Sequence, residues 1–156
     1  MRLTSNAFAD EEQLPIRYTK DGHNLSPPLE WAELPKGTQE LVLFFENVTP
    51  QTKKPYPHWL VYGIPADLDS LPEGFKHKRE PNQPAALRQG MNALGNVGYD
   101  GPLGSVGKRV RFRFRLRALD EPLGLPPGAD KEAVEKAISG HVLEQAELNV
   151  IHERQP

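Results

Sequence analysis

The chain is organised around one stretch, Tyr56-Pro57-His58-Trp59-Leu60-Val61-Tyr62-Gly63-Ile64-Pro65, an apolar run with a proline near each end. The run is shorter than a typical helix and is rich in β-branched and aromatic residues, so the pattern predicts a buried strand. His58 stands near the start of this run, where a central strand would meet a loop. The stretch therefore predicts a core strand with one imidazole at its mouth.

A second apolar run, Leu41–Phe45, precedes this stretch and is apolar at every position. Such a run is typical of a strand buried on both faces in a layered sheet. The polar connection that follows is of roughly hairpin length, so we expect the two strands to pair. Their pairing would place Asn47 and the start of the His58 strand near one edge of the sheet.

Apolar residues alternate strictly with arginines from Val110 to Leu119, which predicts a strand with one apolar and one cationic face. The cationic face carries Arg111, Arg113, Arg115 and Arg117. Three interpretations are open: contact with a nucleic-acid backbone, binding of an acidic protein partner, or a solvated sheet face with acids such as Glu40 or Glu46 on the neighbouring strand. We favour the solvated face.

The rest of the chain predicts one helix, a short helical segment and a final strand. A helix is expected after the capping residue Asp130, with Val134, Ala137 and Ile138 on one side and a stop at Gly140. A second helical turn or two is expected over 141–147, followed by a final strand through Val150 and Ile151. Between residues 65 and 96 the pattern predicts neither a helix nor a strand.

Length and composition indicate a single domain spanning residues 1–156, which is large enough to bury its own core. Its 16 prolines and 13 glycines follow no repeating period, so we expect a loop-rich β fold with little helix. The absence of cysteine excludes a disulfide scaffold, a thiol nucleophile and a cysteine-ligated metal site. A formal net charge of -2 gives no overall bias toward nucleic acid or membranes, and we expect neither as a partner.

The N-terminal residues do not form the apolar core of a signal peptide, and nothing downstream reaches the length of a membrane span, so we expect a soluble cytoplasmic protein. The histidines lack metal-ligand spacing, and we expect neither a metal nor a cofactor. Gly107-Lys108 lacks the spacing of a nucleotide-binding loop, and Ser105 lacks that of a hydrolase elbow.

Five motifs in a fixed order carry a resemblance that spans nearly the whole chain. They are Asp21-Gly22-x-Asn24-x-Ser26-Pro27-Pro28-Leu29-x-Trp31; His58-Trp59 with Ile64-Pro65; Gly98-Tyr99-x-Gly101-Pro102; Ala118-Leu119-Asp120; and Gly140-His141-Val142-Leu143 with Ala146-Glu147-Leu148. In this order they resemble the phosphatidylethanolamine-binding protein family, and most closely its bacterial Raf kinase inhibitor-like branch.

The resemblance implies a mainly β fold, a β-sandwich of antiparallel sheets with peripheral short helices near the C-terminus. It also implies a pocket at one end of the central sheet that takes a small anion or a phosphorylated headgroup. Carried over residue by residue, His58 matches the pocket histidine and is followed by Trp59. Gly101 and Pro102 match the pocket loop, and Arg111 matches the arginine of a His-Arg-Tyr segment.

Other positions depart from the family pattern. Asn47 stands where an aspartate is expected, Val110 replaces the histidine of the His-Arg-Tyr segment, Phe112 replaces its tyrosine, and Leu103 follows the loop without its usual second proline. Each charge-assisted contact that is lost typically costs about 1.5–3 kcal/mol. Asn47 could still orient His58 by a hydrogen bond, but it could not hold the ring as an imidazolium.

The leading functional hypothesis is a non-enzymatic binding protein, with no catalytic residues. Its candidate ligand-binding residues are His58, Asn47, Gly101, Pro102, Phe112, Val110 and Trp59. The first alternative is a regulatory interaction protein, resembling kinase-inhibitor relatives, with a vestigial pocket, an acidic partner at the arginine face and a homodimeric state. The second alternative is a hydrolase or lyase that uses His58 as a general base, although no nucleophile or paired carboxylate accompanies it in the sequence.

Overall fold

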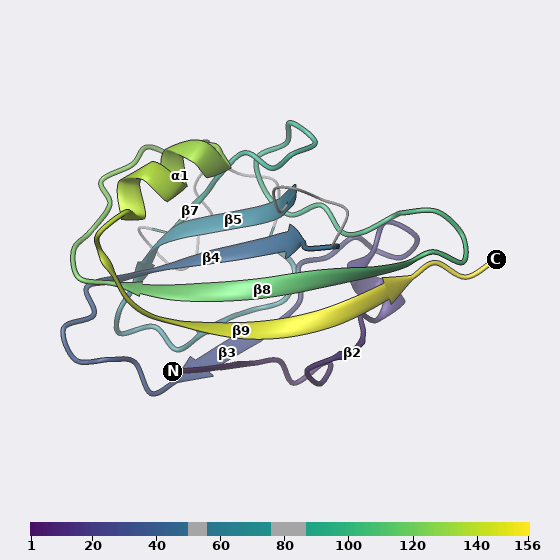
Figure 1. The fold of residues 1–156 in the computed structure, drawn as a ribbon, viewed down its shortest axis with the longest axis horizontal. Helices are drawn as coiled ribbons and strands as arrows, with labels where there is room; N and C mark the ends of the chain where they lie inside the picture. Colours follow the sequence, from purple (N-terminus) through teal and green to yellow (C-terminus); the bar gives the residue numbers. More distant parts are fainter. Residues whose placement is uncertain (50–55, 76–86) are drawn as a thin grey trace.

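The two apolar runs form the centre of a six-stranded sheet. In the computed structural model, which describes residues 1–49, 56–75 and 87–156, β4 (Glu40–Asn47) pairs antiparallel with β5 (Tyr56–Pro65). The order across the sheet is β2-β9-β8-β4-β5-β7, and Figure 1 shows β5, β4, β8 and β9 side by side. The other interior strands are β8 (Arg109–Leu119) and β9 (Val142–Glu153), and the edges are β7 (Arg88–Gln89) and β2 (Glu12–Gln13).

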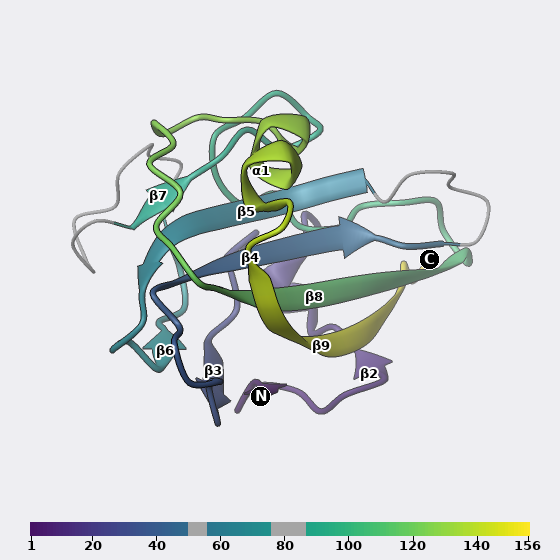
Figure 2. The ribbon, with the colours of Figure 1, turned by 60° about the vertical axis from the view of Figure 1, so that its left-hand side comes forward.

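A smaller sheet and one α-helix cover the two faces of this central sheet. The small sheet has the order β1-β3-β6, formed by β1 (Arg2–Thr4), β3 (Leu29–Ala32) and β6 (Ser70–Leu71). The helix α1 (Lys131–Ile138) lies over β4 and β5 on the opposite face (Figure 2). A short 3-10 helix, η1 (Ile16–Tyr18), follows β2.

The core is divided by the large sheet because alternate residues of each strand point to opposite faces. Phe45 and Trp59 lie in the larger cluster, together with residues of the small sheet. Phe44 and Leu60 lie in a second cluster with Val134 of α1. The prediction that Leu41–Phe45 is buried on both faces is therefore confirmed, since all five residues are 0% exposed.

The mainly β sandwich is confirmed, and so is the alternating strand, which forms β8 with its apolar residues inside. The helix is also confirmed, because the Asp130 side chain accepts a hydrogen bond from the Ala133 N–H at 2.9 Å and caps α1. The sheet is not purely antiparallel, since β2 runs parallel to β9. None of the helices in the described ranges is long and apolar enough to cross a membrane.

The helical turns predicted over 141–147 are wrong, because Val142 already begins β9. Ala146, Leu148 and Val150 are buried at every second position, which is the period of a strand. The short strands β6 and β7 were not predicted, since two residues carry no readable period. Part of the segment 65–96 lies outside the described residues.

Candidate functional site

His58 reaches the inner face of the large sheet through an irregularity in strand pairing. Phe45 pairs with Trp59 and Glu46 pairs with Pro57, so His58 is an extra residue on β5. Such a bulge redirects a side chain and is common beside functional sites. The His58 ring packs edge-on against Phe112, with ring centroids 5.0 Å apart, and against Phe45 at 6.1 Å.

Asp100 orients the His58 ring through its main chain. The Nδ1 atom of His58 lies 2.7 Å from the carbonyl oxygen of Asp100, and the Asp100 N–H donates to the His58 carbonyl at 3.1 Å. Because a carbonyl only accepts, Nδ1 carries the proton in this bond. In the neutral ring Nε2 is then an acceptor, and no hydrogen bond joins it to the described residues. His58 is half-buried, not enclosed.

The environment lowers the pKa of His58 below its ordinary value of 6.5. Burial is the main cause, since it disfavours the charged ring. The hydrogen bond to the Asp100 carbonyl and the Asp100 charge oppose this effect, whereas Lys20 and His152 add to it. At neutral pH the unliganded site therefore holds mainly a neutral imidazole.

The carboxylate of Asp100 is buried behind the segment that carries this carbonyl. Its Oδ2 accepts hydrogen bonds from the amides of Asn92 at 2.7 Å and Asn96 at 2.8 Å. Its Oδ1 lies 3.4 Å from the Asn24 amide nitrogen and 3.6 Å from the ammonium of Lys20. These contacts fix the main chain at Asp100, and they place one cation near the site.

Gly101 and Pro102 continue this segment and are also buried. The Gly101 N–H donates to the Asn24 Oδ1 at 2.6 Å, and the Lys20 N–H donates to the Pro102 carbonyl at 3.0 Å. A Cβ atom at position 101 would lie 2.2 Å from the carbonyl oxygen of Tyr18. Only glycine fits this close approach of two backbones.

Comparison with known proteins decides the family. The model of the family described as phosphatidylethanolamine-binding protein matches residues 4–153. The chain belongs to the phosphatidylethanolamine-binding protein family.

Individual relatives agree with this assignment. A UPF0098 protein of Methanothermobacter thermautotrophicus is 40% identical over 154 residues, which cover 99% of each chain. The structure of Escherichia coli YbcL, described as a member of the mammalian family, matches with a TM-score of 0.88 at 26% identity, covering 99% of this chain and 98% of that one. CT736 from Chlamydia trachomatis matches with a TM-score of 0.85 at 31% identity, covering 99% and 97%.

The structure brings four of the predicted ligand-binding residues of this family member together. His58 contacts Phe112 by its ring and is hydrogen-bonded to Asp100, the residue immediately before Gly101 and Pro102. Phe112 is 3% exposed, so its ring supports the histidine from the core side.

The other three predicted residues play different parts. Asn47 lies directly across from Phe112 on β4. Its Oδ1 accepts hydrogen bonds from the Thr49 N–H at 3.0 Å and from the Thr49 hydroxyl at 2.6 Å. Among the described residues, Asn47 makes no hydrogen bond to His58. The Asp100 carbonyl orients the ring instead. Val110 is 7% exposed and lies two residues before Phe112, on the same face of β8. Trp59 is 0% exposed, and its indole N–H donates to Gln89 at 2.6 Å, so it belongs to the core.

Sequence reasoning missed three groups at this site: Asp100, Asn24 and His152. Asn24 is a specified position of the first quoted motif, so that motif was its signal, whereas Asp100 falls on an unspecified position of the Gly98-Tyr99-x-Gly101-Pro102 motif. His152 is 4% exposed and lies directly across from Val110 on β9. The alternation of the last strand could have revealed it, but that strand was predicted to begin later.

Each predicted stripe arginine has a carboxylate partner. Arg113 and Arg115 lie 3.3 Å and 3.1 Å from Oε1 of Glu46, which is 0% exposed. The ammonium of Lys131 lies 2.5 Å from the other carboxylate oxygen of Glu46. Arg111 and Arg117 pair with other acids, at 2.8 Å and 4.0 Å. The expected acid on the neighbouring strand is Glu46, directly across from Arg113. This face is neutralised within the chain, but the prediction that it is solvated is wrong, because the side chains of Arg115 and Arg117 are 12% and 13% exposed and pair with Glu46 and with Glu135 of α1.

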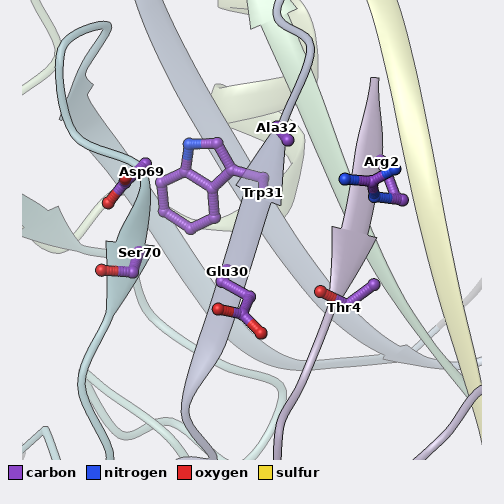
Figure 3. Close-up of a pocket in the computed structure, with 7 residues that line it drawn as sticks. All are labelled: Arg2, Thr4, Glu30, Trp31, Ala32, Asp69 and Ser70. Atoms are coloured by element: carbon purple, nitrogen blue, oxygen red, sulfur yellow. The ribbon is translucent and has the colours of Figure 1, made fainter.

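A separate cavity of about 370 Å³ lies at the small sheet. Figure 3 shows the residues that line it, which are Arg2, Thr4, Glu30, Trp31, Ala32, Asp69 and Ser70. No cluster of three or more metal-binding side chains occurs within residues 1–49, 56–75 and 87–156.

Proposed function

We propose that this family member binds a small anion or a phosphorylated headgroup at His58. The observation that carries the proposal is the fixed ring orientation, in which Nδ1 donates to the Asp100 carbonyl and Nε2 is left without a partner among the described residues. A ring held in this way is preorganised to present one nitrogen to a ligand. Family membership supports the same position.

A proton on Nε2 would strengthen anion binding at this site, because it converts the acceptor nitrogen into a charged donor toward an anionic oxygen. The pKa of the unliganded His58 is lowered by burial, so in this proposal the ligand brings about proton uptake near neutral pH. Lys20 supplies a further positive charge nearby. Phe45 and Phe112 keep the ring in an apolar setting, where a charge-assisted hydrogen bond is stronger than in water.

We favour binding over catalysis because His58 lacks the partners that activate a nucleophile. Within the described part of the chain no hydroxyl group is hydrogen-bonded to His58, and Nδ1 is held by a carbonyl instead of a carboxylate. The Asp100 carboxylate is directed to asparagine amides.

Titration with inorganic phosphate and with phosphoethanolamine, followed by the ring ¹⁵N signals of the histidines, tests the proposal. We expect a saturable shift at His58 Nε2 and a rise in its pKa on binding. His58→Asn keeps a donor near the Nδ1 position and removes Nε2, so it should fold and lose the saturable response. His141→Asn, which changes a half-buried histidine paired with Asp120 and remote from the site, serves as the matched control. A folded wild-type protein whose His58 signals ignore both ligands would contradict the proposal.

The regulatory alternative stays a prediction, as do the homodimeric state and the cytoplasmic location. Because the stripe arginines are already paired, an acidic partner would have to displace Glu11 or Glu135 to reach them. Arg111→Ser and Arg117→Ser should then lower recovery of that partner in a pull-down assay, whereas His58→Asn should leave it unchanged.

A further inference from the structure

His152 is a buried histidine with one unsatisfied nitrogen. It is 4% exposed, its Nε2 donates to the carbonyl of Leu103 at 3.0 Å, and its Nδ1 has no hydrogen-bond partner in the described part of the structure. A buried polar atom without a partner costs free energy. The inward neighbours on the same strand, Leu148 and Val150, are apolar, so an apolar residue would suit the core better. The bond to Leu103 is the contact that distinguishes His152 from such a residue.

His152 stands on the same sheet face as the ligand site. It lies directly across from Val110, and β9 is separated from β5 by β8 and β4. Phe112 packs edge-on against both imidazoles, with centroid distances of 5.0 Å to His58 and 6.5 Å to His152. The two histidines therefore flank one phenyl ring at one end of the sheet.

The same short segment of chain is tied to both rings. Its first residue, Asp100, offers its carbonyl to His58 at 2.7 Å, and its last residue, Leu103, offers its carbonyl to His152 at 3.0 Å. Between them, Asn24 and the Lys20 backbone hold Gly101 and Pro102. Beyond Leu103 the Gly107 N–H donates to the carbonyl of Arg154, the residue directly after β9, at 2.9 Å. His152 thus anchors the point where the buried part of the segment becomes an exposed loop.

We propose that His152 is a positioning residue of the His58 site, which holds Leu103 and the preceding turn in the geometry that the ligand meets. This inference rests on the proposed function. His152 acts through a hydrogen bond to the main chain, not through contact with the ligand. The ligand class is unchanged, a small anion or phosphoryl group, but its affinity depends on a side chain on a strand that does not carry His58.

Two substitutions separate this role from simple packing. His152→Gln places an amide N–H near the Nε2 position and keeps the bond to Leu103, whereas His152→Leu fills the space and removes the donor. Inorganic phosphate is the probe, and the dissociation constant is read from the ring signals of His58. We expect His152→Leu to raise the phosphate dissociation constant by about fivefold or more, the effect of losing one hydrogen bond. The dissociation constant of His152→Gln should stay within about twofold of the wild type.

The carbonyl ¹³C shift of Leu103 provides a readout without ligand, and it should move in His152→Leu but not in His152→Gln. A folded His152→Leu protein with unchanged phosphate affinity would overturn the inference and leave the proposed function intact. Equal losses in both variants would show direct contact with the ligand and would also overturn it. If the wild type binds no phosphate, the proposed function fails, and the inference fails with it. If His152→Leu does not fold, His152→Met, which also removes the donor, takes its place, and an unchanged phosphate affinity in that variant would overturn the inference.

Discussion

Replacing Asn24 by alanine tests whether one side chain holds the segment Asp100–Leu103 in place. Asn24 accepts the Gly101 N–H at 2.6 Å and lies 3.4 Å from the Asp100 carboxylate, and its φ of 55° is in the left-handed region. The orphaned, buried Gly101 N–H should cost about 1–3 kcal/mol. An alanine in the left-handed region should add roughly 1 kcal/mol. We therefore expect Asn24→Ala to lower the free energy of unfolding by about 2–4 kcal/mol.

Two further variants divide this loss into its parts. Asn24→Gly tolerates the positive φ, so it should be about 1 kcal/mol more stable than Asn24→Ala. Asn24→Asp keeps the acceptor for Gly101 but sets a second carboxylate against Asp100, so it should be less stable at pH 7 than at pH 4 relative to the wild type. Urea unfolding measures all three, and phosphate affinity reports the site. A loss in Asn24→Ala within about 0.5 kcal/mol, the range of an ordinary surface change, would refute the reasoning.

Three other predictions follow from charged groups. Phosphate affinity should rise as the pH falls through the lowered pKa of unliganded His58, because the bound state holds one more proton; an affinity that falls toward acid would mean that the neutral ring binds the ligand. The pKa of Glu73 is lowered to about 2 by hydrogen bonds from Arg17 and Tyr18, so its contribution to stability is present above pH 4.5 and lost toward pH 2, and Glu73→Gln should remove this acid dependence in urea titrations. The buried Glu46 faces three cations, so Glu46→Gln should lower the free energy of unfolding by about 3–5 kcal/mol in the same assay, and a neutral result would show that those cations remain solvated.

The strands that build the core could be predicted because their patterns repeat over many residues. The continuous run in β4 and the alternation in β8 each match one burial pattern, and the structure follows both. The 141–147 segment failed because Leu143, Ala146 and Glu147 also fit the spacing of a helix, while the pairing with β8 that decides the matter is non-local. Secondary structure of this kind is set by the neighbouring strand more than by local preference.

The candidate site was predictable only in part, because both of its histidines are held by main-chain carbonyls. His58 is bonded to the carbonyl of Asp100 and His152 to the carbonyl of Leu103. The sequence motifs pointed to His58, Gly101 and Pro102, and the structure links them through Asp100, which is hydrogen-bonded to His58 and directly precedes Gly101. The carbonyl of Asp100 orients the histidine, and a carbonyl leaves no trace in the identity of its residue. Asn47 was a reasonable alternative for that role, yet its side chain closes its own turn with Thr49.

The position of His58 depends on strand register as much as on residue type. In a regular strand His58 and Trp59 would point to opposite faces, yet His58 contacts Phe45 and Phe112, which share the inner cluster with Trp59. The extra residue in β5 makes this possible, while Leu60 still reaches the helix-covered face. Phe45 pairs with Trp59 immediately beside the bulge and fixes where the extra residue falls. Trp59 therefore contributes to the candidate site from within the core, by holding the register that turns the neighbouring imidazole toward the carbonyl of Asp100.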